Sequence, residues 1–85
     1  MRALTPTQMD TLVACYFGEL TIAVDKVHRK YLKIYHNNVD ISGRLKSICK
    51  RRLVKGNYDA GNLIGFIVTD AGIAAIADHP EVKNG

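Results

Sequence analysis

The sequence predicts a mainly α-helical single domain with a small β-hairpin: three core helices, then the hairpin, then one closing helix. Two observations predict this class. Apolar residues recur at helical spacing in four segments, and the period changes to two between residues 53 and 68, around a stretch rich in Gly and Asn. Eighty-five residues, 47% of them hydrophobic, suffice for one core. We expect this domain to cover residues 1–80 and to be followed by a disordered tail over 81–85.

The first helix has a clear start and stop. Thr5 is placed to cap it, Pro6 suits the first helical position, and Gln8 completes a capping box. Gly18 is a C-terminal stop signal. The apolar face of this helix comprises Met9, Leu12, Val13 and Tyr16.

Two basic helices are predicted next. Thr21 is placed to cap a second helix that runs to Ile34, and the segment 35–39 is predicted to turn because Asn tolerates left-handed backbone. Asp40 then caps a third helix that ends near Arg51 or Arg52. The buried stripes are Ala23, Val24, Val27, Tyr31 and Ile34 on the second helix, and Ile41, Leu45, Ile48 and Cys49 on the third.

A hairpin and a closing helix complete the chain. Two β-prone runs, 53–55 and 63–68, flank a seven-residue tip over 56–62. Period two places Ile64, Phe66 and Val68 on the inward face. Thr69 is placed to cap a last helix that ends at Pro80, and its core-facing residues are Ile73, Ala74, Ile76 and Ala77.

Charge is divided unevenly along the chain. Residues 26–55 hold ten of the twelve Lys and Arg residues and only one acid, Asp40, which gives this block a net charge of +9. The remaining residues sum to −5. Such a block is typical of a nucleic-acid surface, and a solvated helix face is the alternative.

Two motifs resemble a known family. The run from Ile41 to Val54 (ISGRLKSICKRRLV) resembles a recognition helix that enters a first wing strand, and 66–73 (FIVTDAGI) resembles the return strand that enters a helix through a Thr-x-x-Gly step. In this order they resemble the winged helix-turn-helix DNA-binding domains of small transcriptional regulators, including the MarR-like group. The resemblance covers Leu4 to Ala77. The sequence departs from the family at Arg52, where Gly is usual, and in its longer interval between Thr21 and Asp40.

The resemblance implies double-stranded DNA as the partner, with the third helix in the major groove and the wing on the backbone. A helix fits that groove, where Arg is the best partner for guanine. Arg44 is therefore the expected base reader, whereas a solvated surface is the alternative for this helix and for the wing tip. The predicted recognition residues are Ser42, Gly43, Arg44, Lys46, Ser47, Lys50 and Arg51, and the predicted backbone contacts are Lys26, Arg29, Lys30, Lys33, Arg52, Lys55, Asn57 and Tyr58.

Other functional classes have little support in the sequence. We expect no enzyme and no cofactor, because there is no phosphate loop, nucleophile motif or carboxylate pair. His28, His36 and His79 match no zinc spacing, so no metal site is predicted. Cys15 and Cys49 are expected to be buried thiols, with a disulfide or a redox sensor as the alternative.

The location and the other partners follow from the same patterns. Without an apolar run of 18 residues, we expect no membrane span and a cytoplasmic protein, associated with the nucleoid if it binds DNA. Neither a small-molecule ligand nor a membrane partner is expected. Surplus apolar residues, namely Tyr31, Leu32, Ile34, Tyr35 and Ile67, indicate either core packing or a homodimer contact. The alternative function is a protein-interaction module whose basic face docks an acidic partner.

Overall fold

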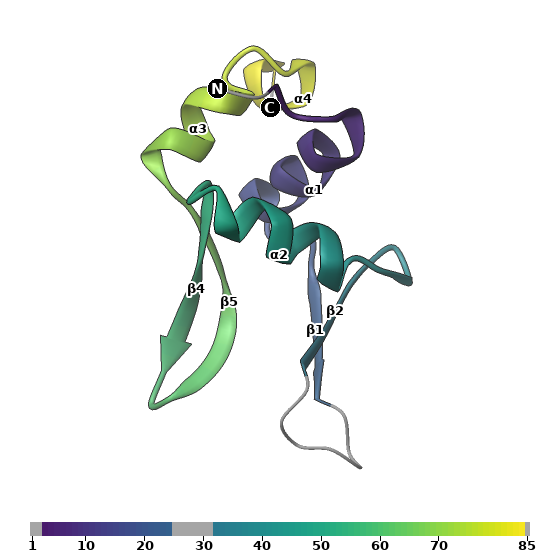
Figure 1. Cartoon of the computed structure of the whole chain (residues 1–85), viewed down its shortest axis with the longest axis vertical. Coiled ribbons are helices and arrows are strands. Elements are labelled where there is room, and N and C mark those ends of the chain that lie inside the picture. Colours follow the sequence, from purple (N-terminus) through teal and green to yellow (C-terminus); the bar gives the residue numbers. More distant parts are fainter. Residues whose placement is uncertain (1–2, 25–31, 85) are drawn as a thin grey trace.

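The computed structural model describes residues 3–24 and 32–84, which form a small α+β fold with two separate antiparallel sheets (Figure 1). One sheet has the strand order β1-β2-β3, and the other is the β4-β5 pair. The prediction of a mainly α-helical winged helix with a single hairpin is therefore wrong. The elements are α1 (Pro6–Phe17), β1 (Thr21–Val24), β2 (Leu32–His36), β3 (Val39–Asp40), α2 (Ser42–Lys50), β4 (Val54–Asp59), β5 (Asn62–Val68), α3 (Asp70–Ile76) and α4 (Pro80–Asn84).

The predicted second helix is replaced by strands. β1 and β2 pair antiparallel, with Ile22 opposite Ile34 and Ala23 opposite Lys33. Ile34 is buried and Ile22 is half-buried against the core, so the apolar residues follow period two. β-branched residues favour strands, but the helical spacing of Ala23, Val24, Val27, Tyr31 and Ile34 led to the prediction of a helix instead. The predicted backbone contacts Lys26, Arg29 and Lys30 lie outside the described residues.

Helix α1 forms as the sequence predicts. Thr5 and Gln8 make both bonds of the capping box, each 3.1 Å long, and Gly18 ends the helix in the left-handed region at φ 69°. Leu12 and Val13 are buried, whereas Tyr16 lies at the surface and stacks edge-on against Phe17. This helix supplies one wall of the core, which α2 and α3 complete with Ile48 and Ile76.

The start of α2 depends on Asp40. Asn37 and Asn38 adopt positive φ and turn β2 into β3, as predicted, but the residue at the N-cap position is Ile41. The Asp40 carboxylate accepts hydrogen bonds from the Ser42 amide (3.0 Å) and the Ser42 hydroxyl (2.7 Å). It therefore satisfies a backbone donor of the first turn, as a cap does, although it stands one residue before the N-cap position.

The β4–β5 hairpin is tighter than predicted. Its turn consists of Ala60 and Gly61, both with positive φ, instead of a seven-residue tip. A bulge between Asn57 and Tyr58 shifts the register, so Leu63 packs against the core while Ile64 is 58% exposed. The inward placement of Ile64 was therefore wrong, whereas Phe66 and Val68 pack inward as predicted.

Thr69 joins the two ends of this hairpin to α3. Its amide donates to the Leu53 carbonyl (3.0 Å), and its hydroxyl donates to the Arg52 carbonyl (2.7 Å) while accepting from the Gly72 amide (3.2 Å). One hydroxyl thus caps α3 and fixes the turn between α2 and β4.

The C-terminal region differs from the prediction in several respects. Ile73, Ala74 and Ala77, all expected in the core, are exposed, whereas Ile76 is fully buried, and α3 ends at Ile76 instead of continuing to Pro80. Residues 81–84, expected in a disordered tail, belong to α4, and Val82 packs against the core. Pro80 begins this helix because its missing amide hydrogen is not needed in the first turn.

Arg52 has the left-handed conformation (φ 59°) at the position where Gly was expected by resemblance. A side chain in this conformation destabilises the folded state by about 1–2 kcal/mol. Gly would relieve this strain, but part of the gain would be lost because Gly also makes the unfolded chain more flexible. Arg52→Gly should therefore stabilise the protein by about 1 kcal/mol in urea unfolding. Arg52→Ala removes the same charge but keeps the strain, so equal stability of the two variants would contradict this explanation.

Cys15 and Cys49 are free thiols, buried and half-buried respectively. Burial, with a smaller contribution from Cys49, raises the pKa of Cys15 from 9.0 to about 12. Above pH 9 the Cys15 thiol therefore ionises in the unfolded chain while it stays protonated in the folded protein. The free energy of unfolding should consequently fall by about 1.4 kcal/mol per pH unit until about pH 12. Urea midpoints at pH 8 and 10.5 measure this fall. The Cys15→Ala variant should show a smaller decrease, and an equal decrease would contradict the assignment.

Candidate nucleic-acid interface

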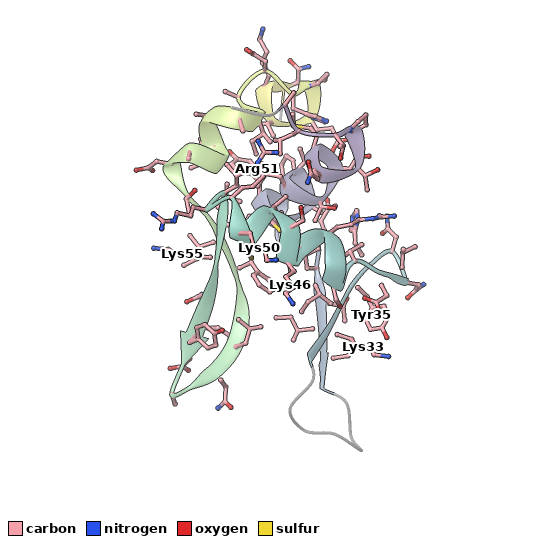
Figure 2. All side chains as sticks on the ribbon, in the orientation of Figure 1. Lys33, Tyr35, Lys46, Lys50, Arg51 and Lys55 are labelled. Carbon is pink, nitrogen blue, oxygen red and sulfur yellow. The ribbon has the colours of Figure 1, made fainter. Side chains whose placement is uncertain are left out.

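The outer face of α2 carries a stripe of small and basic residues. Gly43, Lys46, Ser47 and Lys50 follow helical spacing on the side opposite the buried Leu45 and Ile48. With Gln8 and Arg51 they line an open depression of about 530 Å³. None of the described residues lining it is acidic. Lys46 and Lys50 project from this face towards solvent (Figure 2).

Gln8 of α1 is a part of this surface that the sequence did not reveal. Its side-chain amide donates to the Ser47 hydroxyl over 2.8 Å, while its oxygen accepts from the Thr5 amide. The sequence indicated the role of Gln8 in the capping box, because that motif spans four residues. It gave no indication of the hydrogen bond to Ser47, which is 39 residues away. Ser47 is consequently half-buried and held towards α1.

The hydroxyl group of Ser42 makes hydrogen bonds within the fold. It donates to Asp40 and accepts from the Ile34 amide of β2 over 3.0 Å. The hydrogen bonds from the backbone amide and the side chain of Ser42 lower the pKa of Asp40, burial opposes them, and the charge of Lys33 makes the smallest contribution, which also lowers it. Ser42 thus ties the first turn of α2 to β2, and Lys33 lies near this end of the helix.

Arg44 lies apart from the stripe. It lines a second depression of about 550 Å³, whose described lining includes the acids Asp10, Glu19 and Glu81. His36 contacts Glu19 there at 3.4 Å. The residue expected to read bases therefore lies on a different side of α2 from Lys46 and Lys50, at a depression that three acids also line.

The remaining predicted contacts are distributed around the C-terminal end of α2 and the second sheet. Lys55 is exposed on β4, Arg52 is exposed in the preceding turn, and Arg51 is half-buried between two depressions. Tyr58 is 64% exposed, whereas Asn57 is half-buried and lines a small cavity that also includes Cys15 of α1. On the other side of α2, Lys33 is exposed on β2 beside half-buried Tyr35 (Figure 2).

Three further features concern expectations and alternatives raised by the sequence. In residues 3–24 and 32–84, no three His, Cys, Asp or Glu side chains are grouped as metal ligands would be. Of the surplus apolar residues, Ile34 is buried in the core and Ile67 is 41% exposed on β5. In the same ranges, no helix is both long and apolar enough to cross a membrane.

Comparison with known proteins identifies no relative of this chain. No protein-family model, no curated protein and no solved structure matches the chain.

Proposed function

We propose that this protein binds double-stranded DNA through the outer face of α2 and the adjoining β4–β5 hairpin. The observation that supports this most directly is the depression on α2, which combines Lys46, Lys50 and Arg51 without a described acid. Apart from its chain neighbours and the surrounding backbone of α2, no described atom lies within 4 Å of the position that a Gly43 Cβ would take, so a ligand has access to the backbone there. A helix with such a face fits the major groove of B-DNA.

The position of the cations favours phosphate contacts over base reading. Lys46, Lys50, Arg52 and Lys55 are all exposed along α2 and the start of β4. Lysine binds phosphate as a point charge, and base contacts would fall to Lys46, since Arg44 lies among carboxylates. The protein would then be a cytoplasmic, nucleoid-associated regulator of transcription with modest sequence preference.

Fluorescence anisotropy on a random 20-base-pair duplex across a salt series tests the proposal. If four phosphates are neutralised, log K should fall against log salt with a slope of about −3.6. Double-stranded RNA of the same sequence should bind more weakly, because its deep major groove does not admit a helix. Two results together would contradict DNA binding: no binding to the duplex at low salt, and specific binding of an acidic protein to the same lysines. The function would then be that of a protein-interaction module.

A further inference from the structure

The β1–β2 hairpin gives α2 a second flank that no helix would provide. β3 ends at Asp40, just before α2, and β4 begins at Val54, soon after it, so each sheet adjoins one end of the helix. Both hairpins extend in the same direction from α2, one on each side (Figure 1). The stripe containing Lys46 and Lys50 therefore lies between two projecting pairs of strands.

Exposed cations occur on both flanks. On β2, Ile34 points into the core, so alternation directs Lys33 and Tyr35 to the opposite face, where Figure 2 shows them together. On β4, Val54 is buried and Lys55 is exposed in the same way. Lys33 adjoins Ile34, whose amide donates to Ser42 in the first turn of α2, so Lys33 lies beside the N-terminal end of α2, whereas Lys55 follows the C-terminal end.

We propose that duplex DNA is held on both sides of α2, with Lys33 of the β1–β2 hairpin and Lys55 of the β4–β5 hairpin each contacting phosphate. This inference rests on the proposed function and adds a second backbone contact to it. The major groove is about 12 Å wide, close to the diameter of one helix, so the two phosphate backbones run along a groove that α2 fills and continue past each end of the helix, where Lys33 and Lys55 lie.

The size of the molecule sets the length of DNA that it covers. Its extents are 40 × 26 × 25 Å, and the 26 Å dimension runs across α2 and both hairpins in Figure 1. At about 3.4 Å per base pair, this dimension covers at most about 8 base pairs, because a helix in the groove lies oblique to the duplex axis. We therefore expect full affinity on duplexes somewhat longer than 8 base pairs and a marked loss on shorter ones.

Single substitutions distinguish two flanks from one. At 0.1 M salt the loss of one phosphate contact should weaken binding about 8-fold and reduce the salt slope by about 0.9, since a fifth contact makes the wild-type slope about −4.5. We expect this result for Lys33→Ala and for Lys55→Ala. Lys83→Ala, on exposed α4, is the control and should bind as the wild type does.

The other outcomes are also informative. Lys33→Arg keeps the charge and should restore binding, which separates a phosphate contact from an effect on Asp40 and the start of α2. Wild-type affinity for Lys33→Ala, alongside a loss for Lys46→Ala/Lys50→Ala, would overturn the second flank and leave the proposed function intact. Absence of DNA binding by the wild-type protein would instead overturn both.

Discussion

Replacing Gly72 by Ala should lower the free energy of unfolding by about 3 kcal/mol or more, the upper range for overpacking. Gly72 is buried in the first turn of α3, where a Cβ atom would overlap the Leu53 carbonyl oxygen and lie 2.6 Å from Cγ1 of Val68. The Leu53 carbonyl cannot withdraw easily, because it also accepts the hydrogen bond from the Thr69 amide. Urea unfolding followed by circular dichroism measures the loss.

Gly43→Ala is a matched control for this substitution. Gly43 is also in a helix, but apart from its chain neighbours and the surrounding helix backbone no described atom lies within 4 Å of its added Cβ. The same change should therefore stabilise α2 by up to about 1 kcal/mol through helix propensity. Similar effects at the two positions would show that packing against Leu53 does not explain the glycine in the Thr-x-x-Gly step.

The double substitution Lys46→Ala/Lys50→Ala should weaken binding to duplex DNA about 60-fold at 0.1 M salt. Each lost phosphate contact contributes about 0.9 to the salt slope, so the slope should become less steep by about 1.8. Both side chains are exposed, so stability should change little, and helix propensity favours Ala. Anisotropy titrations across a salt series measure the affinity and the slope together.

Arg44→Ala provides the informative comparison. Arg44 is one turn or less from Lys46 on the same helix, but it lines the depression that contains Asp10, Glu19 and Glu81. Its loss should weaken DNA binding much less than the double substitution does. A larger effect for Arg44→Ala would mean that the sequence-based assignment of the base reader is correct and that the DNA approaches from the acidic side.

The elements that the sequence predicted well are those with local signals. The capping box of Thr5 and Gln8, the Asn turn before β3 and the stripe of Ile41, Leu45 and Ile48 each depend on residues within a few positions of one another. Arg52 is instructive as well, because the departure from the usual Gly coincides with positive φ. Local stereochemistry was sufficient for the first three, whereas the conformation of Arg52 was not predicted.

The errors arose where pairing between distant residues decides the structure. Ile22 and Ile34 are partners across a sheet, whereas the predicted helical stripe began at Ala23, which lies eleven residues, or about three helical turns, before Ile34. A β-bulge leaves Ile64 exposed and places Leu63 against the core instead, and no residue type in the sequence indicates a bulge there. The composition of the candidate site was predictable from charge, whereas the separation of Arg44 from Lys46 depends on what packs beside α2.

The hydrogen bonds that anchor α2 have a consequence for the energetics of recognition. Three different elements hold it along its length: β2 through Ser42, α1 through Ser47, and the start of α3 through the Arg52 carbonyl. The entropy needed to orient the helix is therefore paid during folding, before any partner arrives. Breaking one anchor, for example with Gln8→Ala, should act on association as a loss of preorganisation even though the basic side chains remain in place.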